Sequence, residues 1–247
     1  MKNNIKLEVC VDNIESILVA NEVGVDRLEV CGSLAVGGIT PSAGVVKYAK
    51  NNTDISLHTM IRTRNGDFCF SKEEVKGMEY DVQLLSDLGI HGIVIGFLSR
   101  DLSIDLVTTE KFVKLAKQND LCVTFHRAID LVNNYKSSVK SLIDIGIDRI
   151  LTSGQADIAI CGLDKIAAVN MAFGDKITVM AGSGVTADNV EKIIHETGVK
   201  DIHCSASGIV NKFQEVQLSL GSSASDLKYQ ITDINKLKSI KEKIFQN

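Results

Sequence analysis

Residues 23–31 read Val23-Gly24-Val25-Asp26-Arg27-Leu28-Glu29-Val30-Cys31. The glycine follows an amphipathic segment, which is typical of the end of a helix, and the apolar run after it is typical of a strand. The same order of glycine and apolar run returns at residues 88–94, 145–151 and 197–203. The chain therefore repeats a unit of helix, glycine and strand, which indicates a fold built from four similar quarters.

Four further strand candidates lie between these repeats, at residues 5–11, 55–62, 121–126 and 176–180. Strands that alternate with helices pair in parallel, because each helix returns the chain to the same end of the sheet. Eight such units in 247 residues match a TIM (β/α)8 barrel, and we predict a single α/β barrel domain over residues 1–247. An open doubly wound sheet is the alternative, but four similar quarters fit a closed barrel better.

Capping residues mark three of the predicted helix starts. Asp12 with Glu15 has the spacing of a capping box. Ser71 with Glu74 forms a capping box, in which each side chain bonds the backbone of the other residue. Thr40 before Pro41 is typical of an N-cap followed by proline at the first helical position. After the eighth strand the chain is polar, and we expect irregular structure over residues 207–226 before a final helix.

The composition excludes several classes of protein. Lys and Arg number 27 against 31 Asp and Glu, and the net charge of -4 argues against a surface for nucleic acid or an anionic membrane. A charged residue follows the first methionine too soon for a secretory signal, and no apolar run is long enough to cross a bilayer. We therefore expect a cytoplasmic protein, in which the six cysteines are thiols or ligands rather than disulfides.

The tetrapeptide Leu-Glu-Val-Cys occurs twice, ending at Cys10 and at Cys31. Residues two apart share a face of a strand, so Glu8 points with Cys10 and Glu29 points with Cys31. A carboxylate inside a buried strand is costly unless it is paired, protonated or bound to a ligand. The repetition therefore predicts a site, because cysteines that only fill the core would leave the two glutamates unexplained.

Polar residues also gather where the predicted strands end, and the C-terminal strand ends carry the chemistry of a TIM barrel. The candidates for general acid and base are Glu8, Glu29, His126 and His203. The candidates for binding an anionic substrate are Arg62, Arg127, Ser153, Gly182, Gly184 and Ser205. The bland alternatives are core histidines and arginines that only neutralise the glutamates as buried ion pairs.

Seven stretches of the chain, taken together, resemble one known family, the CutC copper homeostasis proteins. The stretches are LEVCV at 7–11, DRLEVC at 26–31, GGITPS at 37–42, MIRTRNGDF at 60–68, TFHRAID at 124–130, DRILTSG at 148–154 and IHCSA at 202–206. The chain departs from the family pattern at Thr63 and at Ser183, which interrupts a glycine run. The resemblance implies a cytosolic TIM barrel and a copper ion, with Cys10 and Cys31 as its ligands.

Two functions are compatible with these residues. Soft thiolates select Cu(I), and neighbouring strands lie about 4.8 Å apart, so Cys10 and Cys31 can share one copper ion. The alternative is an acid–base lyase or isomerase that acts on a small anionic or phosphorylated metabolite through glutamate, histidine and arginine. We place copper first. The sequence does not decide whether the chain catalyses a reaction, whether it forms a homodimer, or what the remaining thiols do, at Cys69, Cys122, Cys161 and Cys204.

Overall fold

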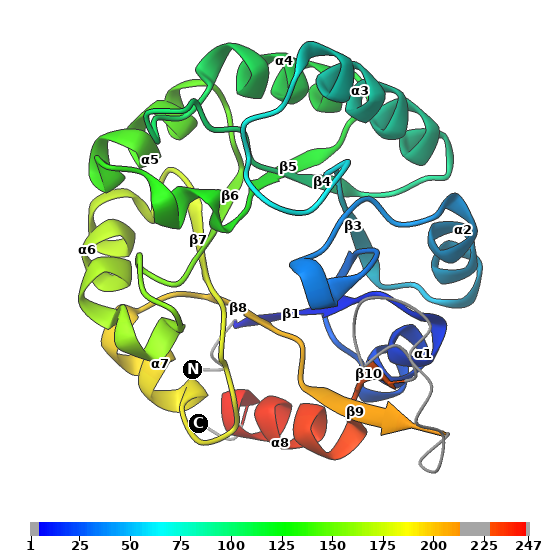
Figure 1. The fold of residues 1–247 in the computed structure, drawn as a ribbon. Helices are drawn as coiled ribbons and strands as arrows, with labels where there is room; N and C mark the ends of the chain where they lie inside the picture. Colours follow the sequence, from blue (N-terminus) through cyan, green and yellow to red (C-terminus); the bar gives the residue numbers. More distant parts are fainter. Residues whose placement is uncertain (1–4, 213–227, 246–247) are drawn as a thin grey trace.

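Eight parallel strands form a closed barrel in the computed structural model, which describes residues 5–212 and 228–245 (Figure 1). The barrel strands are β1 (Lys6–Val11), β2 (Arg27–Val30), β3 (Ser56–Met60), β4 (Gly92–Ile95), β5 (Cys122–Phe125), β6 (Arg149–Thr152), β7 (Thr178–Ala181) and β8 (Asp201–Cys204). The surrounding helices are α1 (Ile14–Val23), α2 (Ala43–Asn52), α3 (Lys72–Asp87), α4 (Leu106–Lys117), α5 (Tyr135–Asp144), α6 (Leu163–Phe173), α7 (Val190–Thr197) and α8 (Ile234–Phe245). The predicted TIM barrel is confirmed.

The four repeated glycines end their helices in the left-handed conformation. Gly24, Gly89, Gly146 and Gly198 have φ angles of 74°, 78°, 89° and 67°. A side chain at such a φ is strained, so glycine is the residue that reverses the chain at least cost before the next strand. The repeat read from the sequence therefore marks four real helix-to-strand turns.

The capping predictions differ in outcome. The capping box predicted at Asp12 is wrong, because Asn13 caps α1 and its side chain accepts a hydrogen bond from Ser16 N at 2.9 Å. The Ser71 side chain accepts a hydrogen bond from Glu74 N, and the Glu74 side chain accepts one from Ser71 N. These two bonds confirm the capping box of α3. The N-cap predicted at Thr40 is wrong, because α2 starts later and Ser42 caps it. Thr40 instead exchanges backbone and side-chain hydrogen bonds with the backbone of Arg62, which holds it in the loop beside the end of β3.

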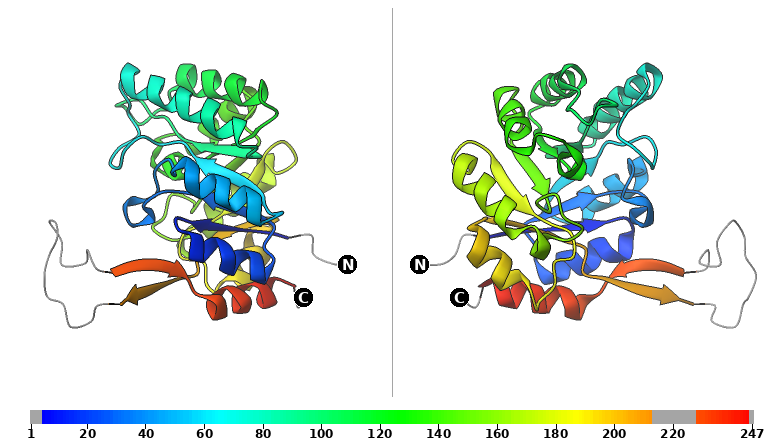
Figure 2. Two further views of the ribbon diagram at one scale, coloured as in Figure 1. Left: turned by 90° about the vertical axis from the view of Figure 1, so that its right-hand side faces the viewer. Right: turned by 60° about the vertical axis from the view of Figure 1, so that its left-hand side comes forward.

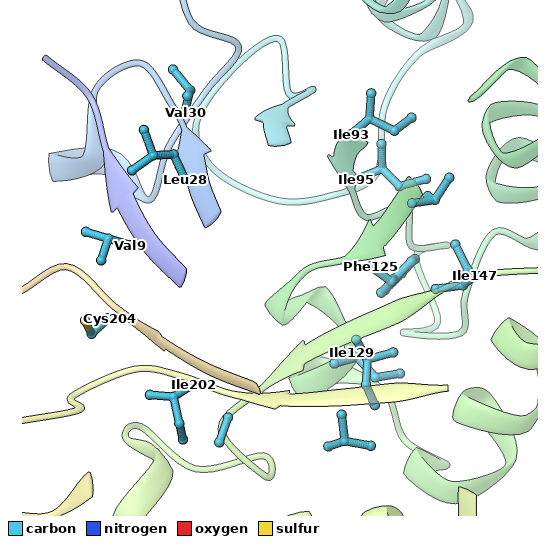
Figure 3. Packing of buried hydrophobic residues seen from close by; sticks show 14 of the residues in the cluster. Val9, Leu28, Val30, Ile93, Ile95, Phe125, Ile129, Ile147, Ile202 and Cys204 are labelled. Atoms are coloured by element: carbon cyan, nitrogen blue, oxygen red, sulfur yellow. The ribbon is translucent and has the colours of Figure 1, made fainter. Parts of the chain in front are cut away.

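An apolar layer lies between the strands and the helices. Val9, Leu28, Ile202 and Cys204 belong to this layer, and Figure 3 shows them pointing away from the barrel interior. The residues one position before and after them on each strand face inward instead, as the alternation of a strand requires. Within the described residues, no helix is both long and apolar enough to span a bilayer.

A two-stranded antiparallel hairpin extends from the barrel after β8 (Figure 2). It consists of β9 (Ser207–Asn211) and β10 (Lys228–Thr232), so the irregular structure expected from residue 207 is wrong for β9. Residues 213–226 of that expectation lie outside the described residues. The polar sequence carries no local signal for β9, because its strand partner, β10, lies further along the chain and cannot be recognised from the neighbouring residues. Thr232 N donates to Ser16 Oγ at 2.9 Å, which anchors the base of the hairpin on α1.

Candidate functional site

A cavity of about 520 Å³ lies at the C-terminal ends of the barrel strands. Most of the predicted site residues form part of its wall, namely Cys10, Glu29, Arg62, His126, Arg127, Gly184, His203 and Ser205. The others are buried and are not among the lining residues, namely Glu8, Cys31, Ser153 and Gly182. The structure therefore brings the predicted residues to one end of the barrel, in two layers.

Glu8 connects a chain of ion pairs on the side of the barrel formed by β1, β2 and β8. Its Oε1 bonds His203 Nδ1 at 2.7 Å, and its Oε2 accepts a hydrogen bond from Arg27 Nε. Arg27 Nη2 then donates to Asp201 Oδ2 at 2.6 Å, and Arg149 Nε lies 3.3 Å from the same oxygen. Because these charges are deeply buried, each one depends on its neighbour for compensation.

Arg27 and Asp201 are not among the site residues predicted from the sequence. The signal for them exists, because Arg27 precedes Glu29 by two residues and Asp201 precedes His203 by two. Strand alternation therefore places both on the inner face of the barrel. Arg27 and Asp201 have opposite charges, so they pair with each other inside the barrel.

Cys10, Glu29 and His203 place one ligand atom each within 4.8 Å of the others. His203 Nε2 lies 3.8 Å from Glu29 Oε2, while Glu8 holds the other ring nitrogen. A carboxylate on the second nitrogen is what orients an imidazole that binds a metal ion. Cys31 Sγ lies 3.5 Å from Glu29 Oε2, so the second predicted thiol adjoins this cluster through Glu29.

The same contacts change the pKa values of the cluster. Burial alone would lower the pKa of His203, but the Cys10 thiol and the carboxylates of Glu8 and Glu29 outweigh it and raise that pKa well above its usual value. Burial raises the pKa of Glu29, and it raises the pKa of Cys31 well above that of a free thiol. A metal ion that binds here therefore has to displace protons.

Arg62 lies on the opposite wall, formed by β3, β5 and the loop after β3. Its Nη1 donates to Gly38 O at 3.1 Å and its Nη2 to Gly66 O at 2.7 Å, and its guanidinium lies 4.8 Å from the centre of the Phe68 ring. Among the described residues no carboxylate pairs with it, and its Nε has no hydrogen-bond partner. Arg62 is thus a cation that is 5% exposed and forms no ion pair among the described residues, and Asp67 acts on it only at a longer distance.

Arg127 has a different environment, although it also lines the cavity. Its Nε donates to Asp130 at 3.0 Å, and its terminal nitrogens donate to Ser153 Oγ at 2.8 Å and Ser183 Oγ at 3.1 Å. These bonds tie together the loops after β5, β6 and β7. The glycine turn after β7 is closely packed as well, because a Cβ on Gly184 would lie 2.5 Å from the side chain of Ile158.

His126 is a neutral hydrogen-bond donor with a defined tautomer. Burial, together with the charge of Arg62, lowers the pKa of His126 to about 3. Its Nδ1 accepts the backbone N–H of Ala128 at 3.1 Å, so the ring hydrogen is on Nε2. Nε2 has no partner among the described residues, and the ring lies 4.8 Å from that of Phe68.

Two glycines on the inner face of the barrel make room for the histidine rings. A Cβ on Gly92 would overlap the ring of His58, and a Cβ on Gly96 would overlap the ring of His126. These glycines are not among the predicted site residues. Gly92 lies in the repeat at residues 88–94, and a glycine inside a strand marks a close approach, so this signal could have found it. Gly96 lies beyond that repeat and carries no such signal.

The cysteines fall into three environments, and all six are free thiols. Cys10 and Cys31 lie in or beside the cluster described above, and the carbonyl of Cys204 accepts the Cys10 thiol at 3.6 Å. Cys204 is buried in the apolar layer, and Cys69, Cys122 and Cys161 are more exposed. Cys10 is therefore the thiol within the cluster, and Cys31 adjoins it through Glu29.

Comparison with known proteins gives one consistent family. Residues 5–208 match the model of the CutC family. A "family protein CutC" from Glaesserella parasuis is 43% identical over 95% of this chain and 97% of its own length, and the human "Copper homeostasis protein cutC homolog" is 36% identical over 96% and 88%. A crystal structure assigned to copper homeostasis protein CutC from Streptococcus agalactiae superposes with a TM-score of 0.76, at 33% identity over 81% of this chain and 97% of that one.

Proposed function

The chain belongs to the CutC family, and on that premise we propose that it is a cytoplasmic copper homeostasis protein that binds Cu(I) at the mouth of its barrel. The observation that carries the proposal is the group of ligand atoms of Cys10, Glu29 and His203 within 4.8 Å of one another. The ion is cargo in this proposal, taken up and released by the cluster.

The donor set favours a soft ion. Thiolate is the preferred ligand of Cu(I), and imidazole suits copper as well, whereas a carboxylate is a hard donor. From this cluster we therefore assign Cys10 and His203 Nε2 to the ion, and we add Cys31, whose thiol adjoins the cluster through Glu29, in place of the hard carboxylate. Glu29 accepts the Cys31 thiol at 3.5 Å, so it is placed to take the proton that this thiol loses on binding.

The test is a competition titration with a Cu(I) chelator. The double variant Cys10→Ser, Cys31→Ser should lose stoichiometric Cu(I) binding, because serine keeps the volume and replaces a soft donor with a hard one. The matched control is Cys122→Ser, Cys161→Ser, which changes two exposed thiols and should bind as the wild type does. Wild-type affinity in the first variant would place the copper elsewhere.

A second candidate function, an acid–base lyase or isomerase, is favoured by one observation. Glu29 Oε1 is buried without a hydrogen-bond partner among the described residues, and burial raises the pKa of this carboxyl. A carboxyl group of that kind suits general acid catalysis. In the same titration Glu29→Gln should keep Cu(I) binding if copper is the cargo. Loss of a co-purified metabolite in Glu29→Gln, with normal copper binding, would instead favour the enzyme.

A further inference from the structure

We propose that the β3–β5 wall of the cavity is a subsite for an oxyanion, the carboxylate or phosphate group of a small metabolite, held by Arg62 and His126. The subsite shares the cavity of the copper site but does not depend on copper binding. The subsite lies in the part of the cavity that is not taken up by the cluster of Cys10, Glu29 and His203, and its ligand is a small anion.

The size of the cavity is the first argument. Its volume of about 520 Å³ falls in the range of small-molecule sites, which is roughly 300–1,000 Å³. The three ligand atoms of the cluster lie within 4.8 Å of one another, so a bound ion occupies a small part of that space. The remaining wall has its own polar residues, and these determine what fits there.

Arg62 is the second argument. Its bonds to Gly38 O, to Val36 O and to Gly66 O use three of the five guanidinium hydrogens and fix the group in place. They leave the Nε–H and one Nη2–H, and a planar fork of such donors matches a carboxylate or phosphate. Asp67 acts on this buried guanidinium only from a distance, so no carboxylate contacts it directly, and an anionic ligand would supply that contact.

The other arginines of this region show that Arg62 is the exception. Arg27 and Arg149 both reach Asp201, and Arg127 reaches Asp130. Their charges are compensated by the protein itself. Of the described arginines inside the barrel or on the cavity wall, Arg62 is the one that forms no ion pair.

His126 is the third argument, because its chemistry fits an anion and not a metal ion. Its Nδ1 lone pair accepts the Ala128 N–H, and its Nε2 carries the hydrogen, so the neutral ring has no lone pair free for a metal. The Nε2–H is a buried donor without a partner among the described residues. A buried donor of this kind is costly to leave unpaired, and an oxygen of the ligand satisfies it.

Phe68 connects the two donors. Its ring lies 4.8 Å from the guanidinium of Arg62 and 4.8 Å from the ring of His126, and both unpaired nitrogens are shielded from solvent. The ligand therefore reaches them when the Phe68 side chain turns aside. Phe68 lies in the loop between β3 and α3, outside the regular elements, so a rotation of its side chain leaves the barrel in place.

The experiment is isothermal titration calorimetry of the copper-free protein with two probes, inorganic phosphate and malonate. Wild type should bind at least one of them, and the preference between the probes distinguishes a phosphate ligand from a carboxylate ligand. Arg62→Met should weaken that binding by about 10-fold to 100-fold, since a hydrogen-bonded charge pair is lost. His126→Phe, which keeps a ring and removes the N–H, should weaken it about tenfold.

The matched control is Arg64→Met, because Arg64 lies two residues further on and is already paired with Asp67 and Glu74. It should bind the probe as wild type does, apart from the general effect of one charge. Arg62→Lys keeps the charge without the fork and should fall between wild type and Arg62→Met. If Arg62→Met does not fold, Arg62→Lys is the variant that tests the role of the guanidinium group.

Three results would overturn the subsite: no binding of either probe to the wild type at millimolar concentration, equal affinity in Arg62→Met and wild type, or an equal loss in Arg64→Met. The copper titration on Arg62→Met separates the two proposals. Normal Cu(I) binding with lost anion binding supports the subsite whatever the outcome at Cys10 and Cys31.

Discussion

On the β1–β2–β8 side of the mouth Glu8 meets both His203 and Arg27, whereas on the β3–β5 side Arg62 meets backbone carbonyls and an aromatic ring. The first side pairs Glu8, Arg27 and Asp201 with one another, although Glu29 Oε1 has no hydrogen-bond partner among the described residues. The second side holds a cation and a neutral N–H donor, on His126, that the described residues leave partly unsatisfied. Both sides are equally buried, so the difference lies in pairing and not in exposure to water.

This difference separates charges that are paired within the protein from a charge that is not, inside one cavity. A buried charge that has its partner contributes to a fixed interior, and removal of the partner is costly. A buried donor without a partner lowers stability in the free protein and is retained where a ligand satisfies it. Variants on the two sides should therefore differ most in their effect on stability.

The largest effect is expected from Arg27→Met. The substitution leaves the Glu8 and Asp201 carboxylates buried without their shared cation, and breaking a buried pair in this way costs about 3–5 kcal/mol. Arg62→Met should cost only about 1 kcal/mol, because it breaks no ion pair and cavity water can replace its bonds to carbonyls. Urea denaturation of both variants measures the difference. Equal losses would refute the contrast between the two sides.

A smaller effect is expected from Gly96→Ala. The added methyl group overlaps the ring of His126 and also approaches Ala128, so the ring has to move. Overpacking of this kind costs about 1–3 kcal/mol, and it should weaken anion binding as well. Thermal unfolding and the phosphate titration measure the two effects.

Gly77→Ala is the control for that substitution. A Cβ on Gly77, within α3, meets no atom within 4 Å. The alanine should therefore raise the free energy of unfolding by about 0.5–1 kcal/mol through helix propensity alone. A loss of stability in both glycine variants would mean that the overlap with His126 is not the cause.

A separate effect is the pH dependence that His126 contributes. Its pKa is about 3 in the folded protein and near 6.5 when unfolded, so between these values the unfolded state binds more protons. Stability should therefore fall as the pH falls through this window, by up to about 1.4 kcal/mol per pH unit from this residue. His126→Phe removes the part of the pH dependence of stability that comes from His126. The part that comes from the carboxylates is the same in both proteins. Urea titrations of the two proteins at several pH values measure the difference, and identical pH slopes would contradict the neutral, buried imidazole.

The sequence predicted the barrel because its signals are local. The glycine at each helix end and the alternation along each strand both act over a few residues, and they were sufficient for the order of the eight strands. The inward positions of Glu8, Glu29 and His203 follow from the same alternation. The capping box of α3 is local too.

The remaining features depend on which segments meet in space. Arg27 and Asp201 pair across β2 and β8, which are not neighbours in the barrel, and Gly96 matters because of a ring on the next strand. Thr40 does not cap α2 as predicted, because its hydroxyl accepts a hydrogen bond from Arg62 N instead. Unpaired donors are also invisible in a sequence, since a side chain type does not reveal whether its partner exists.

The barrel closes where β1 pairs with β8, and this pairing sets Glu8 opposite His203. The two residues are 195 positions apart, so a ribosome makes almost the whole chain before they can meet. Since domains fold as the chain emerges from its N-terminus, Cys10 spends that time without the imidazole that completes its cluster. Under the proposed function, an ion that needs Cys10 and His203 together is therefore captured by closed barrels in preference to nascent chains that lack β8.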